Sequence, residues 1–358
     1  MDNDLLIDVK NLRVSFHTDE GFITPVDGVN YQVRRGKTLG IVGESGSGKS
    51  VSTRALTKLL PKNAVIEPTS QILFYQNGAA QPLNITPLSP NSKEIRAIRG
   101  GQVGMIFQEP MASFSPVYTV GNQIIEAVRQ HRHAAASPLA ATATIGSQID
   151  ESIRAGNKKM SKLEARDVAV DMLERVGIGN AGLRVNQYPH ELSGGMRQRA
   201  MIAVALSTHP SVLIADEPTT ALDVTIQAQI LELMRELQAE LGMAIIFITH
   251  DMGVIAQIAD EVAVMYLGAI VERGPTRELI EDARHPYTRG LLAAIPSLDR
   301  LDTRLSSVPG DIPSPLERPA GCLFHTRCPH RIDGTCERFA PERTEVVPNH
   351  FVRCHLYR

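Results

Sequence analysis

Tryptophan is absent from this chain of 358 residues, and aromatic residues make up only 4% of it. No apolar run approaches the roughly 20 residues that a membrane-spanning helix needs, so we predict no membrane span. The N-terminus has no basic segment followed by a long apolar stretch, which argues against a signal peptide and predicts a cytosolic protein. A large charge imbalance is also missing: the net charge is −2, which implies no general attraction to nucleic acid.

Cysteine is missing from all of the chain before Cys322. In a cytosolic protein, thiols clustered at one end favour a metal site over disulfides. Four thiolates suit tetrahedral Zn²⁺ or an iron–sulfur cluster, although the spacing matches neither a zinc ribbon nor a ferredoxin. Free thiols in a small core are the alternative. The residues concerned are Cys322, Cys328, Cys336 and Cys354.

Short apolar runs alternate with helical patterns through the first 285 residues or so, which predicts an α/β fold with a largely parallel sheet. The runs at 39–42, 212–215 and 244–248 are continuous and apolar, as in strands buried on both faces. Between the last two runs, apolar residues recur every three or four positions from Ile226 to Leu241, which predicts an amphipathic helix. Asp223 is its expected N-cap.

Two stretches differ from this pattern. From about Gln130 to Ser161 the chain has little apolar periodicity, and we predict a mobile insertion within a helical region. From about His285 onward prolines multiply, which predicts an irregular C-terminal module.

A glycine-rich segment follows the first predicted strand and fits the pattern GxxxxGK[ST]. Glycines let a backbone wrap closely around phosphates with its N–H groups pointing inward, whereas a chance glycine-rich turn is the alternative. Lys49 would contact the β- and γ-phosphates, Ser50 would ligate Mg²⁺, and the helix starting there adds its positive dipole end. The predicted ATP-binding residues are Gly43, Glu44, Ser45, Gly46, Ser47, Gly48, Lys49, Ser50 and Val51.

The predicted strand at 212–215 ends in two carboxylates, Asp216 and Glu217. Beside the glycine-rich segment at 43–51, which is a phosphate-binding loop (P-loop), Asp216 would hold Mg²⁺ and Glu217 would polarise the attacking water as general base. In isolation, a solvated acidic strand end would explain the same residues.

A third segment, Leu192-Ser-Gly-Gly-Met196, resembles the signature motif of ATP-binding-cassette (ABC) proteins, which no other P-loop class uses. On this motif the chain is identified as an ABC ATPase. Ser193, Gly194 and Gly195 would meet phosphate at a helix start. The usual fifth residue of the motif is Gln, and Met196 replaces it; the groups facing phosphate should nevertheless be Ser193 and backbone amides.

Smaller matches follow in the family order. Gln108 resembles the Q-loop glutamine that contacts Mg²⁺ and water, and His250 resembles the switch histidine that reaches the γ-phosphate. Asp223 lies in a segment that resembles the D-loop. Phe16 resembles the aromatic residue that stacks on adenine, with Phe22 competing for this role. Taken alone, each of these side chains would more often be structural.

The resemblance implies a P-loop NTPase with a RecA-like mixed sheet core and a helical subdomain. We expect an ABC domain at 1–284, with the helical subdomain at about 109–200 and the insertion at about 130–161, and an extension at 285–358. In this family, ATP lies between the P-loop of one subunit and the signature of another, so a head-to-tail dimer is implied. ATP would close the pair and hydrolysis would reopen it.

Segments such as His285-Pro-Tyr-Thr-Arg-Gly-Leu-Leu292 look like those of dipeptide and oligopeptide importer ATPases. The resemblance implies a second, similar ATPase, two permeases and a substrate-binding protein, at the cytoplasmic face of the membrane; whether the ATPase pair is homo- or heterodimeric stays open. Related importers carry nickel chelates, glutathione, opines or oligosaccharides. Some peptide-importer ATPases hold a [4Fe–4S] cluster on four such cysteines, which favours iron over zinc.

Two other functions compete with transport. A soluble ABC ATPase acting on DNA or ribosomes would tend to have long coiled coils or two cassettes, and this chain has neither and is not basic. A regulatory subunit that does not hydrolyse ATP would be expected to lack Glu217 or His250, and both are present.

Overall fold

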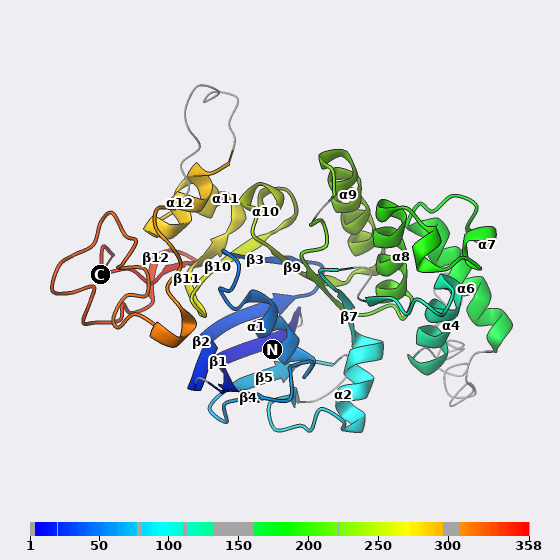
Figure 1. Cartoon of the computed structure of the whole chain (residues 1–358), viewed down its shortest axis with the longest axis horizontal. Helices are drawn as coiled ribbons and strands as arrows, with labels where there is room; N and C mark the ends of the chain where they lie inside the picture. Colours follow the sequence, from blue (N-terminus) through cyan, green and yellow to red (C-terminus); the bar gives the residue numbers. More distant parts are fainter. Residues whose placement is uncertain are drawn as a thin grey trace. The chain divides into compact units, whose positions relative to one another are not determined.

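The computed structural model describes residues 4–19, 21–76, 81–109, 113–131, 161–220, 222–295 and 308–357. They form two compact units (Figure 1), residues Met1–Ile95 together with Ala244–Arg358, and residues Arg96–Met243. The chain leaves the first unit within α2 (Lys93–Ala97), which continues into the short π-helix η1 (Ile98–Gln102).

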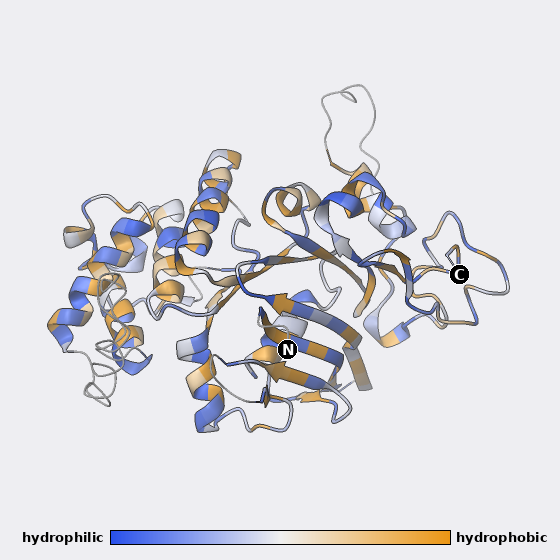
Figure 2. Cartoon of the chain, turned by 180° about the vertical axis from the view of Figure 1, so that it is seen from behind, coloured by the Kyte–Doolittle hydropathy of each residue, from blue (hydrophilic) through white to orange (hydrophobic). Residues whose placement is uncertain are grey.

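The first unit contains an antiparallel sheet built on two long strands, β1 and β2. Their residues alternate between apolar and polar, as Figure 2 shows beside the N-terminus, so that one face is buried. β4 and β5 both pair with β1, and β6 pairs with β5. The strands are β1 (Leu5–Thr18), β2 (Gly21–Arg34), β4 (Ala64–Ile66), β5 (Gln71–Phe74) and β6 (Leu83–Asn84).

A second sheet of this unit runs in the order β12-β13-β11-β10-β3-β9. β3 pairs in parallel with β9 and β10, and every residue of β3 and β9 is buried. The strands predicted at 39–42 and 244–248 are therefore confirmed. The elements are β3 (Thr38–Val42), β9 (Ala244–Thr249), β10 (Glu261–Tyr266) and β11 (Ala269–Pro275), with helices α1 (Lys49–Leu56), α10 (Met252–Ile258) and α11 (Thr276–Glu281).

The C-terminal extension is less irregular than its prolines suggest. Its hairpin of β12 (Thr344–Val347) and β13 (His350–Val352) joins the second sheet, because β13 pairs with β11. The pairing carries a buried polar contact in which the Nε2 atom of His350 lies 2.8 Å from a carboxylate oxygen of Glu272. Within the part of the extension that the structure describes, the other regular elements are α12 (Pro286–Ala293) and a turn of 3₁₀-helix, η4 (Pro315–Glu317).

The second unit holds two parallel strands, β7 (Val103–Ile106) and β8 (Val212–Asp216), and several helices (Figure 1). All of β8 is buried, which confirms the strand predicted at 212–215. The predicted helix is α9 (Val224–Leu241), and Asp223 caps it by accepting a hydrogen bond from the backbone N–H of Ile226 at 2.9 Å. The other helices among its described residues are α4 (Val120–His131), α6 (Lys162–Arg175), α7 (Ala181–Arg184), η2 (Pro189–Glu191) and α8 (Gly194–Leu206).

The predicted insertion at 130–161 lies almost wholly outside the described residues. Gln130 and His131 are the last residues of α4, and Ser161 opens α6 with a capping box that includes Glu164. Among the helices that the structure describes, none is both long enough and apolar enough to span a bilayer.

Candidate nucleotide-binding site

The P-loop of the first unit leaves β3 at Gly43 and enters α1 after Gly48. Gly48 has a φ of 95°, and a Cβ atom on it would lie 2.1 Å from the carbonyl oxygen of Pro25. A Cβ atom on Gly43 would lie 2.2 Å from the carbonyl oxygen of Met265. Both approaches are closer than any side chain tolerates, so the path of the loop requires glycine at these two positions.

Two polar side chains of the P-loop are buried. Lys49 donates hydrogen bonds from its ammonium to the carbonyl oxygens of Gly43 at 2.7 Å and Glu44 at 2.9 Å. No described residue hydrogen-bonds the buried hydroxyl of Ser47. A buried hydroxyl without a protein partner usually has another ligand, and the loop around it offers backbone N–H groups suited to phosphate.

In the second unit, β8 ends in the two predicted carboxylates. Asp216 is fully buried, and the following Glu217 adopts a φ of 50°, which is unusual for a non-glycine residue. The Glu217 carboxylate accepts hydrogen bonds from the Gln108 amide and from the Thr220 hydroxyl, both at 3.1 Å. Gln108 and Glu217, predicted separately from two motifs, thus lie together.

The signature segment begins α8. Ser193 is the N-cap residue, and its hydroxyl accepts a hydrogen bond from the backbone N–H of Met196 at 3.4 Å. The chain continues as Gly194 and Gly195, and a Cβ atom on Gly194 would meet nothing within 4 Å among the described residues. The N-terminus of α8 therefore combines free space with backbone N–H groups, which suits the binding of an anion.

The remaining predicted residues lie in the first unit. His250 is exposed directly after β9. Phe16 is half-buried in β1, whereas the side chain of Phe22 is 69% exposed and packs edge-on against His17 with ring centroids 4.3 Å apart. The predicted site residues therefore divide between the units: the P-loop, Phe16 and His250 in the first, and Gln108, Ser193, Gly194, Gly195, Asp216, Glu217 and Asp223 in the second.

Sequence reasoning missed two residues that hold the P-loop. The guanidinium of Arg327 pairs with the Glu44 carboxylate in two hydrogen bonds of 2.7 and 3.0 Å, and the Tyr287 hydroxyl accepts from the Glu44 backbone N–H at 2.9 Å. Tyr287 stands in the His-Pro-Tyr-Thr segment that indicated the family. Nothing in the P-loop motif itself points to Arg327, which lies 283 residues away.

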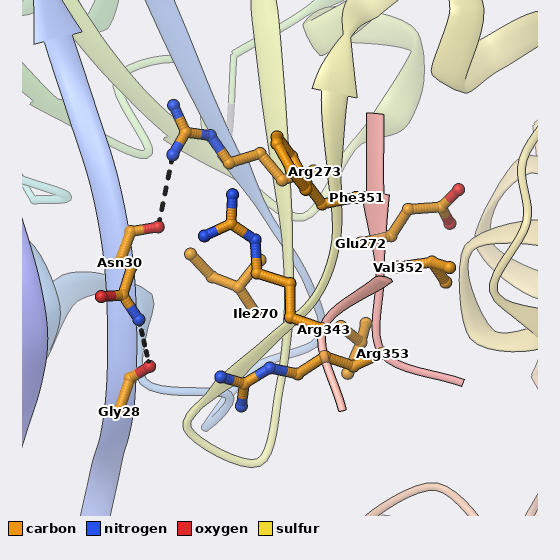
Figure 3. A pocket seen from close by; sticks show the side chains of 10 residues that line it. Gly28, Asn30, Ile270, Glu272, Arg273, Arg343, Phe351, Val352 and Arg353 are labelled. Carbon is orange, nitrogen blue, oxygen red and sulfur yellow. Dashed lines mark hydrogen bonds between the residues drawn. The ribbon is translucent and has the colours of Figure 1, made fainter. Parts of the chain in front are cut away.

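A recess between β2, β11 and the C-terminal hairpin is not a nucleotide site. Figure 3 shows Arg273, Arg343 and Arg353 extending toward β2 while Glu272 points the other way. Partial burial lowers the pKa of Arg343, and the like charges of Arg273 and Arg353 lower it further. The recess leaves about 20 Å³, room for roughly one water molecule. The arginines themselves fill it.

The four cysteines gather within the C-terminal extension. Cys322, Cys336 and Cys354 are buried and Cys328 is half-buried, all as free thiols. Burial and, to a smaller extent, the charges of the other three thiols raise the pKa of Cys322 to about 11. Burial also raises the pKa of Cys328 and of Cys354, and backbone N–H groups of Phe324, His330 and Leu356 partly offset the shifts of Cys322, Cys328 and Cys354 by donating hydrogen bonds to them. The backbone N–H of Ile332 donates a hydrogen bond to the Cys336 sulfur at 3.4 Å.

This arrangement bears on the predicted metal. Among the described residues, no three His, Cys, Asp or Glu side chains converge so as to hold one metal ion. That finding supports neither the zinc prediction nor the iron–sulfur prediction.

Comparison with other proteins agrees with this geometry. Residues 26–220 match the family model for ABC transporters, and the chain therefore belongs to the ABC transporter family. The dimeric structure of MJ0796, a bacterial ABC transporter cassette, aligns with a TM-score of 0.58 and 25% identity over 76% of this chain and 99% of that one. CbiO1 from Clostridium perfringens aligns with a TM-score of 0.56 and 27% identity, over 78% of this chain and 92% of that chain.

A second family match and two full-length relatives identify the group within this family. Residues 271–336 match the C-terminal region of oligopeptide/dipeptide transporters. The chain is 45% identical over 352 residues to the oligopeptide transport ATP-binding protein OppD of Bacillus subtilis, with 98% of this chain and 88% of that protein aligned. It is 43% identical over 351 residues to the dipeptide transport ATP-binding protein DppD of the same organism, with 98% and 94% aligned. Within the ABC transporter family, it is an ATP-binding subunit of the oligopeptide/dipeptide group.

Proposed function

We propose that this chain is the ATP-hydrolysing motor of a peptide importer and that Glu217 is its general base. The observation that carries the assignment is the Glu217 carboxylate, which the Gln108 amide and the Thr220 hydroxyl orient at the end of a buried strand. A carboxylate fixed in this way can accept a proton from the attacking water. Lys49, Ser50 and Asp216 would bind the triphosphate and Mg²⁺, and His250 would reach the γ-phosphate.

Each active site is proposed to be shared between two subunits. The P-loop of one subunit and Ser193, Gly194 and Gly195 of its partner would enclose one ATP, and Asp223 would lie near the same seam. Both surfaces offer N–H groups and glycine, so the charge of the nucleotide would bridge them. Phe16, or else the exposed Phe22, would stack on adenine.

We extend the transport of peptides from the relatives to this chain. The matched C-terminal region and the two Bacillus relatives favour peptides as cargo. Nickel chelates, glutathione, opines and oligosaccharides are the alternatives. We place the subunit at the cytoplasmic face of the membrane, paired with a second ATPase beneath two permeases that a substrate-binding protein supplies. The ABC domain would span 1–284 and the extension 285–358.

We also propose that Cys322, Cys328, Cys336 and Cys354 hold a [4Fe–4S] cluster. The cluster would cross-link a proline-rich extension whose described residues form few regular elements. Elemental analysis of protein purified without oxygen tests this assignment: four iron atoms per chain are expected, and zinc without iron would contradict it.

Hydrolysis by the purified chain tests the central assignment. Wild type is expected to release phosphate from Mg-ATP, and Glu217→Gln is expected to release it at least about 100-fold more slowly. Nucleotide binding by the variant should persist, because Glu217 is assigned to chemistry rather than to affinity. Equal rates for the two proteins would favour a non-catalytic regulatory subunit.

A further inference from the structure

Glu44, the second residue of the P-loop, is held through its backbone and its side chain. Its backbone N–H donates to the Tyr287 hydroxyl at 2.9 Å. Its carbonyl oxygen accepts from the Lys49 ammonium at 2.9 Å and from the Ser47 backbone N–H at 3.2 Å. Its carboxylate accepts the two hydrogen bonds from Arg327. The residue that fixes the start of the P-loop is therefore itself fixed by the C-terminal extension.

Arg327 is built into its position. Its side chain is only 4% exposed, and its Nε and Nη2 atoms also donate to the carbonyl oxygens of Pro309 and Val308, at 2.9 and 3.2 Å. The guanidinium lies over the rings of Tyr266 and Phe324, 5.8 and 6.0 Å from their centroids. A planar group held in this way cannot follow a moving carboxylate, so it dictates where Glu44 lies.

The packing around this ion pair joins the extension to the elements beneath the P-loop. Tyr266 from β10, Tyr287 from α12 and Phe324 from the extension form a buried cluster with ring centroids 4.7 to 5.4 Å apart. Phe324 and Arg327 lie between Cys322 and Cys328 in the chain. Folding of the cysteine segment therefore delivers both the aromatic ring and the guanidinium to the P-loop.

We propose that Arg327 is a positioning residue for nucleotide binding. Through Glu44 it holds the carbonyl oxygen that orients Lys49, so the affinity of the P-loop for nucleotide depends on the folded extension. The inference rests on the proposed nucleotide site at the P-loop. Because coupling between two sites is reciprocal, nucleotide binding should in turn stabilise the segment at 322–328.

A purely structural ion pair would behave differently. If Arg327 only anchored the extension, its loss would lower thermal stability and leave the nucleotide affinity of the folded protein unchanged. A positioning role predicts that the affinity for nucleotide changes, and that the effect of replacing Arg327 depends on whether Glu44 is present.

Calorimetric titration of the full chain with Mg-ADP separates the two roles. Arg327→Gln and Glu44→Gln are each expected to raise the dissociation constant for Mg-ADP about tenfold, within the usual range for coupled sites. The double variant should bind no more weakly than either single variant, and Arg327→Lys should recover part of the affinity. Should Arg327→Gln fail to fold, Glu44→Gln carries the test, because its amide oxygen can still accept a hydrogen bond.

The matched control is Arg331→Gln. Arg331 lies in the same extension and pairs with Asp333 and Glu337, so its loss should leave Mg-ADP binding unchanged. Hydrogen exchange at 322–328 should slow when Mg-ADP binds wild type and should not slow in Glu44→Gln. A lower melting temperature with wild-type affinity in both variants would overturn the inference. Failure of wild type to bind Mg-ADP would instead overturn the proposed function.

Discussion

The side-chain amide of Gln108 donates a hydrogen bond to the carboxylate of Glu217 at 3.1 Å, although 109 residues separate the two in the chain. Gln108 follows β7 and Glu217 follows β8, and these two strands pair in parallel. Their carboxyl ends therefore meet at one edge, which brings the two side chains together.

Gln108→Leu should slow hydrolysis without preventing nucleotide binding. The variant removes the hydrogen bond from the Gln108 amide to Glu217, so the carboxylate loses part of what fixes its orientation. We expect kcat to fall about 10- to 100-fold, as for other partners that orient groups around a metal, and the Michaelis constant to change little. Phosphate-release kinetics measure both. Gln130→Leu on α4, where the amide donates to Glu126, is the matched control and should leave kcat unchanged.

Gly48→Ala should abolish nucleotide binding. The added methyl group would lie 2.1 Å from the Pro25 carbonyl oxygen in a backbone conformation that alanine avoids, so the loop must change shape. Titration with Mg-ADP is expected to show no binding by a protein that is still folded by circular dichroism. Gly182→Ala serves as control, because a Cβ atom there meets nothing within 4 Å among the described residues. Wild-type affinity of Gly48→Ala for Mg-ADP would show that nucleotide binding does not require this backbone conformation of the P-loop.

Burial of His285 should make stability fall in mild acid. Burial lowers the pKa of His285 from 6.5 to about 4, so the folded protein keeps this imidazole neutral where the unfolded chain protonates it. The contribution is complete above about pH 6.5 and is lost as the pH falls toward 4, by up to about 1.4 kcal/mol per pH unit.

Urea unfolding at pH 7.5 and 5.5 measures this contribution. Wild type should lose about 1 kcal/mol more than His285→Asn, which keeps an N-cap residue for α12 and removes the titrating group. The same loss in both proteins would exclude His285 as its source.

His350→Leu should loosen the C-terminal hairpin. Glu272 is 1% exposed and would remain as a buried carboxylate without its imidazole partner. Leaving a buried charge without its partner costs about 3–5 kcal/mol, although the backbone N–H groups of Arg284 and His285 would still donate to Glu272. Chemical denaturation measures the loss. His330→Leu, at an exposed position of the same extension, should change stability by less than about 0.5 kcal/mol.

Local sequence patterns predicted the parts of the fold that depend on local chemistry. The continuous apolar runs became the buried strands β3, β8 and β9, and Asp223 caps α9 as its position indicated. The motifs located the P-loop and the acidic strand end. The pairing of β13 with β11 could not be predicted, because a three-residue strand carries no periodicity. The contact between Arg327 and Glu44 joins residues 283 positions apart and has no local signal.

Sedimentation of the Glu217→Gln variant tests whether two subunits share each active site. With hydrolysis blocked, Mg-ATP should convert a monomer into a dimer, and the additional change Ser193→Arg should prevent this. A dimer that forms equally well without nucleotide, or one that Ser193→Arg leaves intact, would contradict a site that ATP closes between two subunits.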